Sequence, residues 1–149
     1  RALVFNNRGD LQLNLEGYNS VIAGGVKLRS GGRVSQYNGS TLQAAAVVMG
    51  ASHGIKQQAG SVIDTGSALF DSTAGVMDLI GDYQFSDVVT LRNSSNEAVT
   101  LRDVKSSAPL QLGSPSLGSG LLSVTAASGI RQSGDFFLGG NAFFDGGDG

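Results

Sequence analysis

Few residues of this 149-residue chain have the chemistry of a catalytic or metal site. His53 is the only histidine and cysteine is absent, so no second soft ligand exists to complete a zinc-type site. Two segments similar to the one around His53 carry Gly32 and Ser128 at the same position. A position shared by Gly, His and Ser predicts an exposed loop rather than a catalytic base. The sequence therefore predicts no metal and no cofactor.

The aspartates could serve acid–base chemistry, as carboxylates do in β-helical enzymes that cleave polysaccharides. Such chemistry needs acidic and basic groups that converge in one groove. The candidates lie 4 to 7 residues apart along the chain and are Asp64, Asp71, Asp78, Asp82 and Asp87. Because charged residues make up only 15% of the chain, we expect no enzyme, and a carbohydrate-active enzyme is the least favoured alternative.

Two short motifs could bind a ligand. Arg8-Gly9-Asp10 is an integrin-type tripeptide in an expected turn, and it is the candidate receptor-binding site. An ordinary turn is the alternative interpretation, because Gly and Asp are common in turns. The Gly- and Asp-rich segment 139–149 resembles calcium-binding nonapeptide repeats, but those need several tandem copies and this segment holds one imperfect copy.

The chain repeats itself, and this repeat must position all of these residues. Residues 26–39 (VKLRSGGRVSQYNG) align without a gap with residues 47–60 (VVMGASHGIKQQAG), at an offset of 21 residues. A third copy lies at 122–134 (LSVTAASGIRQSG), and segment 61–75 resembles 135–149. A period of about 20 residues inside a unit of about 75 is typical of a solenoid, in which each coil of chain, here called a rung, stacks on the previous one.

Alternation of apolar and polar residues predicts strands. Leu11, Leu13 and Leu15 are separated by polar residues, and loop-forming clusters of Gly, Ser and Asn interrupt such runs. The Ala-rich segment 42–49 has helical propensity, but the repeat aligns its end with a strand. A β-sandwich or jelly roll needs no internal repeat, whereas a β-solenoid requires one. We therefore expect an all-β fold, a right-handed parallel β-helix of about seven rungs of ~20 residues.

The repeat also predicts which side chains stack inside the rod. The expected core stack has two sets at equivalent positions: Val34, Ile55 and Ile130, followed two residues later by Gln36, Gln57 and Gln132. A buried amide must be hydrogen-bonded. The glutamines could bond to one another along the rod axis, or each could end its strand and cap the following loop.

Neither end of the chain shows the polar cap that soluble solenoids carry. Segment 2–5 is apolar, and an open rung offers unpaired backbone groups to another chain. We therefore expect residues 1–149 to be a single solenoid segment, continued at both ends by further repeats or by stacked copies of itself. The residues expected to make these end-to-end contacts are Leu3, Phe5, Phe143 and Phe144.

Charge and hydropathy exclude two classes of partner. The net charge is −2, and the ten Lys and Arg residues are scattered singly, so we expect no nucleic-acid binding. No apolar run approaches the ~18–20 residues of a membrane span, so we expect no membrane insertion of this segment. The absence of cysteine fits a reducing compartment or a secreted protein that crosses a membrane unfolded.

Five strand patterns follow one another over residues 75–134. They are Phe85/Val88/Val89/Leu91, Val99/Leu101, Leu110/Leu112/Gly113, Leu122/Val124/Ala126 and Gly129/Ile130/Gln132/Gly134. This order resembles the shaft repeats of filamentous-haemagglutinin-like exoproteins, the large adhesins of bacterial two-partner secretion. Asp87 departs from the pattern, because the family often has Gly there. The resemblance implies a right-handed parallel β-helix that is secreted to the cell surface and forms a fibre shaft without catalytic residues.

We therefore expect a structural shaft segment of a secreted bacterial adhesin or extracellular filament. Its expected location is extracellular or at the bacterial cell surface, and its expected partners are further copies or repeats of itself. The alternative is a module on a β-helix that binds a host surface receptor or glycan.

Overall fold

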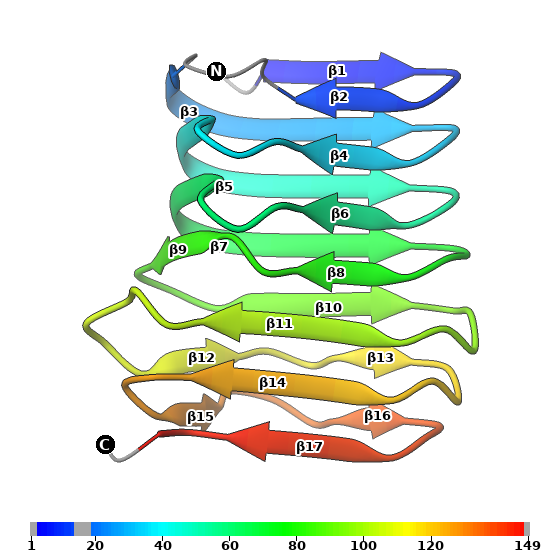
Figure 1. The fold of residues 1–149 in the computed structure, drawn as a ribbon, viewed down its shortest axis with the longest axis vertical. Helices are drawn as coiled ribbons and strands as arrows, with labels where there is room; N and C mark the ends of the chain where they lie inside the picture. Colours follow the sequence, from blue (N-terminus) through cyan, green and yellow to red (C-terminus); the bar gives the residue numbers. More distant parts are fainter. Residues whose placement is uncertain (1–2, 14–18, 148–149) are drawn as a thin grey trace.

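The chain folds into a rod of stacked rungs (Figure 1). The computed structural model describes residues 3–13 and 19–147, and this part contains strands and no helix. The strands form two parallel sheets that share one interior. The coil is right-handed, as connections between parallel strands of one sheet almost always are.

The larger sheet, called sheet A, has ten strands. They are β1 (Leu3–Asn7), β3 (Asn19–Ser30), β5 (Thr41–Ala51), β7 (Val62–Ser72), β9 (Asp82–Phe85), β10 (Val89–Asn93), β12 (Leu110–Leu112), β13 (Ser116–Leu117), β15 (Ile130–Gln132) and β16 (Phe137–Leu138). Sheet B has seven strands. They are β2 (Leu11–Leu13), β4 (Val34–Gln36), β6 (Ile55–Gln57), β8 (Met77–Leu79), β11 (Val99–Asp103), β14 (Leu122–Ala126) and β17 (Ala142–Asp145).

Every pairing in the two sheets is parallel and joins consecutive rungs. Val26 pairs with Val47, and Val34 pairs with Ile55, both at the offset of 21 residues that the sequence repeat predicts. The predicted parallel β-solenoid of about seven rungs is therefore confirmed. The Ala-rich segment 42–49 is part of β5, so its helical propensity is overridden by pairing with the strands on both sides.

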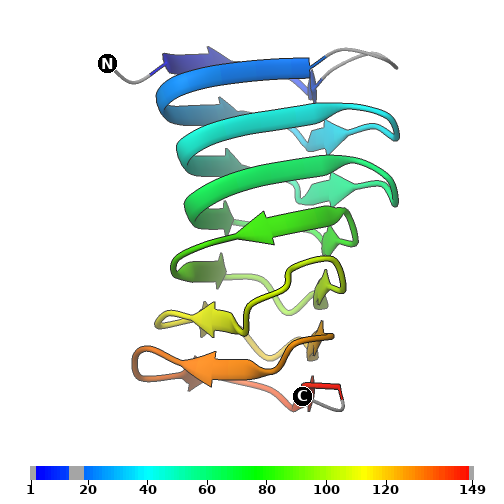
Figure 2. The same cartoon turned by 90° about the vertical axis from the view of Figure 1, so that its left-hand side faces the viewer.

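The first rungs are wide because β3, β5 and β7 each wrap around a corner of the rod (Figure 2). The register of β3 against β5 shifts between Ile22 and Gly25, where the backbone bends. The first half of β7 pairs with β9, and its second half pairs with β10. Each long strand therefore supplies two outer faces, and sheet B supplies a third.

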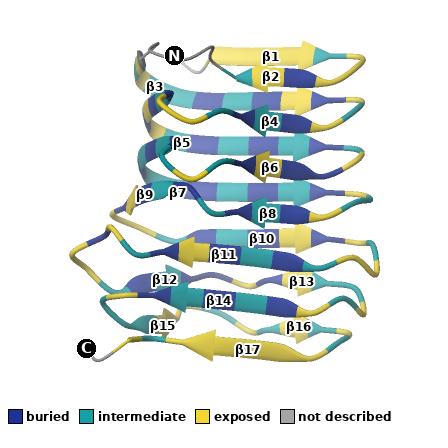
Figure 3. Cartoon of the chain, viewed as in Figure 1, coloured by how far each residue is buried: buried dark blue, intermediate teal, exposed yellow. Residues whose placement is uncertain are grey.

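Between the two terminal strands, the interior is lined by alternate residues of the strands (Figure 3). In β5 the inward residues Val47 and Met49 are buried, and in β8 the same holds for Met77 and Leu79. Where the wide rungs end, the ring of Tyr83 stacks on a phenylalanine of the same strand. This ring pair fills the middle of the rod. Since a single rung has only one neighbour on each side, its inner face is buried only when both neighbours are in place.

The third copy of the repeat does not lie where the sequence placed it. Ile130 pairs with Leu110, and Gln132 pairs with Leu112, so both residues belong to sheet A. Val34 and Ile55 lie in sheet B. The 75 residues between Ile55 and Ile130 amount to about three and a half rungs, which puts the third copy on the opposite side of the rod.

Tight loops connect sheet A to sheet B. Two of these loops, in consecutive rungs, lie in close contact at their glycines. Gly54 has a φ of +102° and Gly75 a φ of +80°, a backbone region that side chains disfavour. A Cβ at Gly54 would lie 2.5 Å from the carbonyl oxygen of Val76 in the next rung. Glycine is required here because consecutive loops approach each other too closely for a side chain.

The first prediction concerns the inward position of β6. Replacing Ile55, which is fully buried, by Asp should lower the free energy of unfolding by at least about 3 kcal/mol, because the carboxylate has no partner inside the rod. Ser35→Asp is the matched control, since this outward residue pairs with Lys56 in the next strand. Urea unfolding measures both variants. Equal destabilisation by the two substitutions would contradict the inward and outward assignment.

Candidate functional site

The most distinctive internal feature is a column of polar side chains along the rod axis. Gln36 ends β4, Gln57 ends β6 in the next rung, and Tyr83 reaches them from β9 across the interior. The Tyr83 hydroxyl donates to Oε1 of Gln57, and Nε2 of Gln57 donates to Oε1 of Gln36 at 2.8 Å. Nε2 of Gln36 donates to the carbonyl oxygen of Val62 at 3.0 Å. All three side chains are buried.

The glutamines therefore divide between the two alternatives that the sequence left open. Gln36 and Gln57 bond to each other along the rod axis. Gln132 is exposed, and its Nε2 donates to the carbonyl oxygen of Gly134 at 2.8 Å. This residue caps the loop after its own strand.

Tyr83 is a donor in this column and remains protonated. Burial raises its pKa well above the ordinary value, because the phenolate would lose its solvation, and the nearby charges of Asp78, Asp103 and Asp82 raise it further. The hydroxyl is enclosed in the core, so its role is to satisfy the buried amide of Gln57.

A buried carboxyl group lies one rung further along. Asp103 takes the third inward position of β11, after Val99 and Leu101. Its Oδ1 accepts from the backbone N–H of Ser106 at 3.2 Å, whereas Oδ2 has no hydrogen-bond partner among the described residues. Burial raises the pKa of this carboxyl group. We did not single out Asp103 from the sequence, although the alternation Val99-x-Leu101-x-Asp103 places it on the inward side.

The five aspartates considered as catalytic candidates do not gather in one place. Asp64 and Asp71 lie on the two different faces formed by β7, and Asp78 lies on sheet B. Asp82 begins β9, and Asp87 follows that strand in a loop. Within residues 3–13 and 19–147, no three His, Cys, Asp or Glu side chains are placed to hold a metal ion, and no helix is long and apolar enough to cross a membrane.

The Arg8-Gly9-Asp10 tripeptide forms the loop between β1 and β2, and all three residues are exposed. Oδ1 of Asp10 accepts from the backbone N–H of Arg33 in the next rung at 2.7 Å. The carbonyl oxygen of Gly9 accepts from the hydroxyl of Ser30 at 2.6 Å. The Asp10 carboxylate thus holds two loops together, and receptor binding by this tripeptide stays a prediction.

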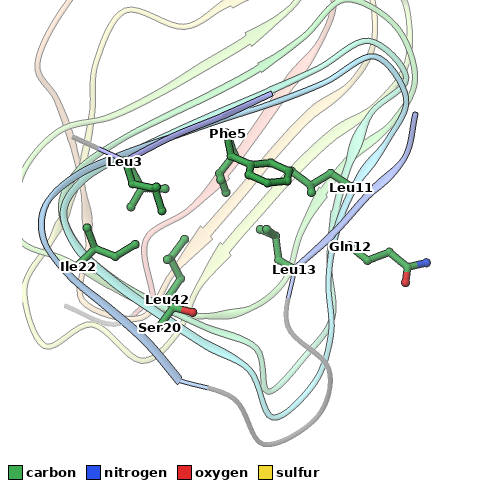
Figure 4. A pocket seen from close by; sticks show the side chains of 10 residues that line it. Leu3, Phe5, Leu11, Gln12, Leu13, Ser20, Ile22 and Leu42 are labelled. Carbon is green, nitrogen blue, oxygen red and sulfur yellow. The ribbon is translucent and has the colours of Figure 1, made fainter. Parts of the chain in front are cut away.

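Both ends of the described rod expose apolar side chains. At the N-terminal end, Leu3 and Phe5 of β1 are each about half exposed, and a hollow of about 230 Å³ opens between β1 and β2 (Figure 4). Leu11, Leu13 and Ile22 line its walls. At the other end, Phe143 is 58% and Phe144 41% exposed on β17. The four residues predicted for end-to-end contacts therefore lie on terminal strands with open edges, and their contacts stay a prediction.

Comparison with known proteins supports the repeat and leaves the activity open. Residues 95–149, from the loop before β11 to the end of the chain, match a family described as repeats of unknown function (DUF5649). No curated protein and no solved structure matches the chain. The family match and the fold together support a β-solenoid built of repeats.

The second prediction tests the polar column by a double-mutant cycle. Tyr83→Phe should cost about 1–3 kcal/mol because it leaves Oε1 of Gln57 buried without a donor. Gln57→Leu should cost more, since it leaves both the Tyr83 hydroxyl and Oε1 of Gln36 unpaired. The double variant should cost less than the sum by about 1–3 kcal/mol. Urea unfolding gives the three values, and strict additivity would contradict the bonded column.

The third prediction concerns the charge of Asp103. Because its pKa is raised in the folded protein, the folded state holds the proton more tightly than the unfolded state. The stability that this proton confers should be present at about pH 4 and lost as pH rises through the raised pKa. Asp103→Asn should remove this part of the pH dependence, whereas Asp135→Asn at an exposed position should not. Thermal melts between pH 4 and pH 8 measure the effect, and identical profiles for wild type and Asp103→Asn would contradict it.

Proposed function

We propose that this chain is a shaft segment of a secreted bacterial adhesin or extracellular filament of the filamentous-haemagglutinin-like type. The observation that carries the proposal is the stack of about seven parallel rungs, with exposed apolar side chains on the strands at both ends of the described rod. The sequence resemblance over residues 75–134 and the match to a repeat family over 95–149 support it. The absence of cysteine fits secretion in an unfolded form.

Adding a further rung at either end would lower the free energy of the rod, because it would bury apolar side chains. A further rung on β1 would pair its outer backbone groups and cover Leu3 and Phe5, and a rung on β17 would cover Phe144, which pairs with the buried Val124. Complete burial of one such side chain contributes about 1.5–3 kcal/mol. Phe143 pairs with the half-buried Ser123 and lies on the outer face. The added rung could come from further chain or from a second copy. Because the two ends differ, contacts between copies would be head to tail and would not close into a ring.

A shaft needs stiffness and length, and the fold supplies both. The wide rungs are joined by long ladders, since β5 pairs with β7 from Thr41 to Ala51. Each rung adds about 4.8 Å of length. The five aspartates considered above lie apart on different parts of the described rod, which suits a spacer that holds another part of an assembly away from the cell.

A receptor- or glycan-binding module is the second candidate. The exposed loop of Arg8, Gly9 and Asp10 favours it, because the Arg8 side chain makes no hydrogen bond within the described residues and is free to contact a partner. The involvement of the Asp10 carboxylate with Arg33 weighs against this loop, since one carboxylate oxygen is already occupied.

The fourth prediction tests the open ends. Purified chain should form particles whose length and light scattering increase with protein concentration, and electron microscopy should show rods of varied length. Phe144→Asp and Phe5→Asp should each suppress this growth, because they place a charge in the end-to-end contact. Val76→Asp is the control, since Val76 is 46% exposed in the loop between β7 and β8, away from both ends of the rod. A monomer at every concentration, or equal suppression by Val76→Asp, would contradict stacking.

A further inference from the structure

One outer face of the rod carries a groove lined by basic side chains. It lies on the second halves of β3, β5 and β7 and on β10, where a hollow of about 360 Å³ opens. Parallel register places Arg29 beside Gly50, Gly50 beside Asp71, and Asp71 beside Arg92. These four positions form one row along the rod axis, across four consecutive rungs. We call this feature the basic groove.

The hollow exists because Gly50, which lies between Arg29 and Asp71 in the row, has no side chain. Apolar side chains form the rest of its floor. The outward residues Val48 and Leu69 form a parallel row beside it, next to Lys27. Both are half-buried, so they offer a flat apolar surface beside the charged row.

The charge in the groove opposes that of the whole protein. Lys27, Arg29 and Arg92 give three positive charges against the single carboxylate of Asp71, whereas the full chain has a net charge of −2. Among the described residues, these four side chains make no hydrogen bond or ion pair with one another or with any neighbour. Their full hydrogen-bonding capacity is therefore available to a ligand.

We propose that the basic groove binds a linear acidic polysaccharide whose sugar units carry carboxylates. A guanidinium group binds a carboxylate through two parallel hydrogen bonds, so Arg29 and Arg92 would each hold one uronate unit. The apolar floor would contact the C–H face of the sugar ring between them. The Asp71 carboxylate would accept hydrogen bonds from sugar hydroxyls between the two carboxylate-binding arginines.

The spacing of the arginines calls for a polymer rather than a free uronate. Arg29 and Arg92 are separated by three strand-to-strand steps, which is about 14 Å along the rod. One sugar unit is too short to reach both, whereas a short chain laid along the axis meets both guanidinium groups. This activity goes beyond the shaft role, because a shaft can stand whether or not one of its faces holds a glycan.

The test measures binding of two defined probes, a hexamer of galacturonate and a hexamer of mannuronate, to the intact chain by titration calorimetry. A neutral galactose hexamer, free galacturonic acid and single-stranded DNA of similar charge are the comparisons. We expect at least one uronate hexamer to bind, with the monomer and the neutral hexamer at least ~10-fold weaker. Failure of both uronate hexamers to bind, or equally tight binding of the DNA, overturns the proposal.

Variants locate the binding site on the rod. Arg29→Gln and Arg92→Gln should each weaken hexamer binding by about 10-fold. Arg102→Gln is the matched control, because Arg102 is exposed on sheet B and its loss changes the net charge equally. Gly50→Leu should fill the groove and abolish binding, and the fold should tolerate it, since a Cβ at Gly50 would meet its nearest atom, Cγ of Arg29, at 3.6 Å.

The variants also separate this inference from the shaft proposal. Melting temperatures of the groove variants should stay within about 2 °C of wild type, so that lost binding reports the groove and not unfolding. Rod growth with concentration should be unchanged in all of them. An equal loss of binding in Arg102→Gln, or undiminished binding in Gly50→Leu, would place the ligand elsewhere and overturn the assignment.

Discussion

Pairing between successive rungs is the interaction on which this whole molecule depends. A single rung cannot satisfy its own backbone or bury its own inner face, so both tasks fall to the rungs on either side. This explains why the offset between paired residues is so regular, at 21 for Val26 and Val47 and again for Val34 and Ile55. It also explains why the two terminal strands are left with open edges and exposed Phe side chains.

In the narrow interior, a polar side chain is stable only when its polar atoms are hydrogen-bonded. Gln57 is tolerated there because its amide has a donor from Tyr83 and an acceptor in Gln36, one rung away. The Asp103 carboxyl group is only partly hydrogen-bonded, since one of its oxygens has no partner among the described residues. The polar column and the buried acid thus arise from the same geometry. An inward position repeats at every rung, and a side chain placed there must find its partner above, below or across the rod.

The sequence predicted the inner half of the structure better than the outer half. Inward positions such as Val34 and Ile55 must repeat, because each contacts its counterpart one rung away, and this repetition is visible in the chain. The prediction for Ile130 was wrong because sequence similarity shows that two segments occupy similar environments. It does not show whether they lie in the same sheet of the rod. The basic groove could not be foreseen, since its outward residues are not alike from rung to rung. Only the register shows that Arg29 and Arg92, far apart in sequence, share one row.

The unequal lengths of the ladders make the rod mechanically uneven. Between β5 and β7 ten residue pairs are in register, whereas β10 meets β12 and β13 through three. Because the bonds between rungs run along the rod axis, a pull on the two ends would load these junctions in series, and the weakest would part first. Sheet B adds five pairs at this junction, between β11 and β14, and the resulting total of eight equals the five pairs of β1 with β3 plus the three of β2 with β4. Under tension the rungs at both ends would therefore part first and lengthen the chain. The rungs of β3, β5 and β7 would stay intact because ten residue pairs join each to the next, so the segment would act as a force absorber with a rigid middle and extensible ends.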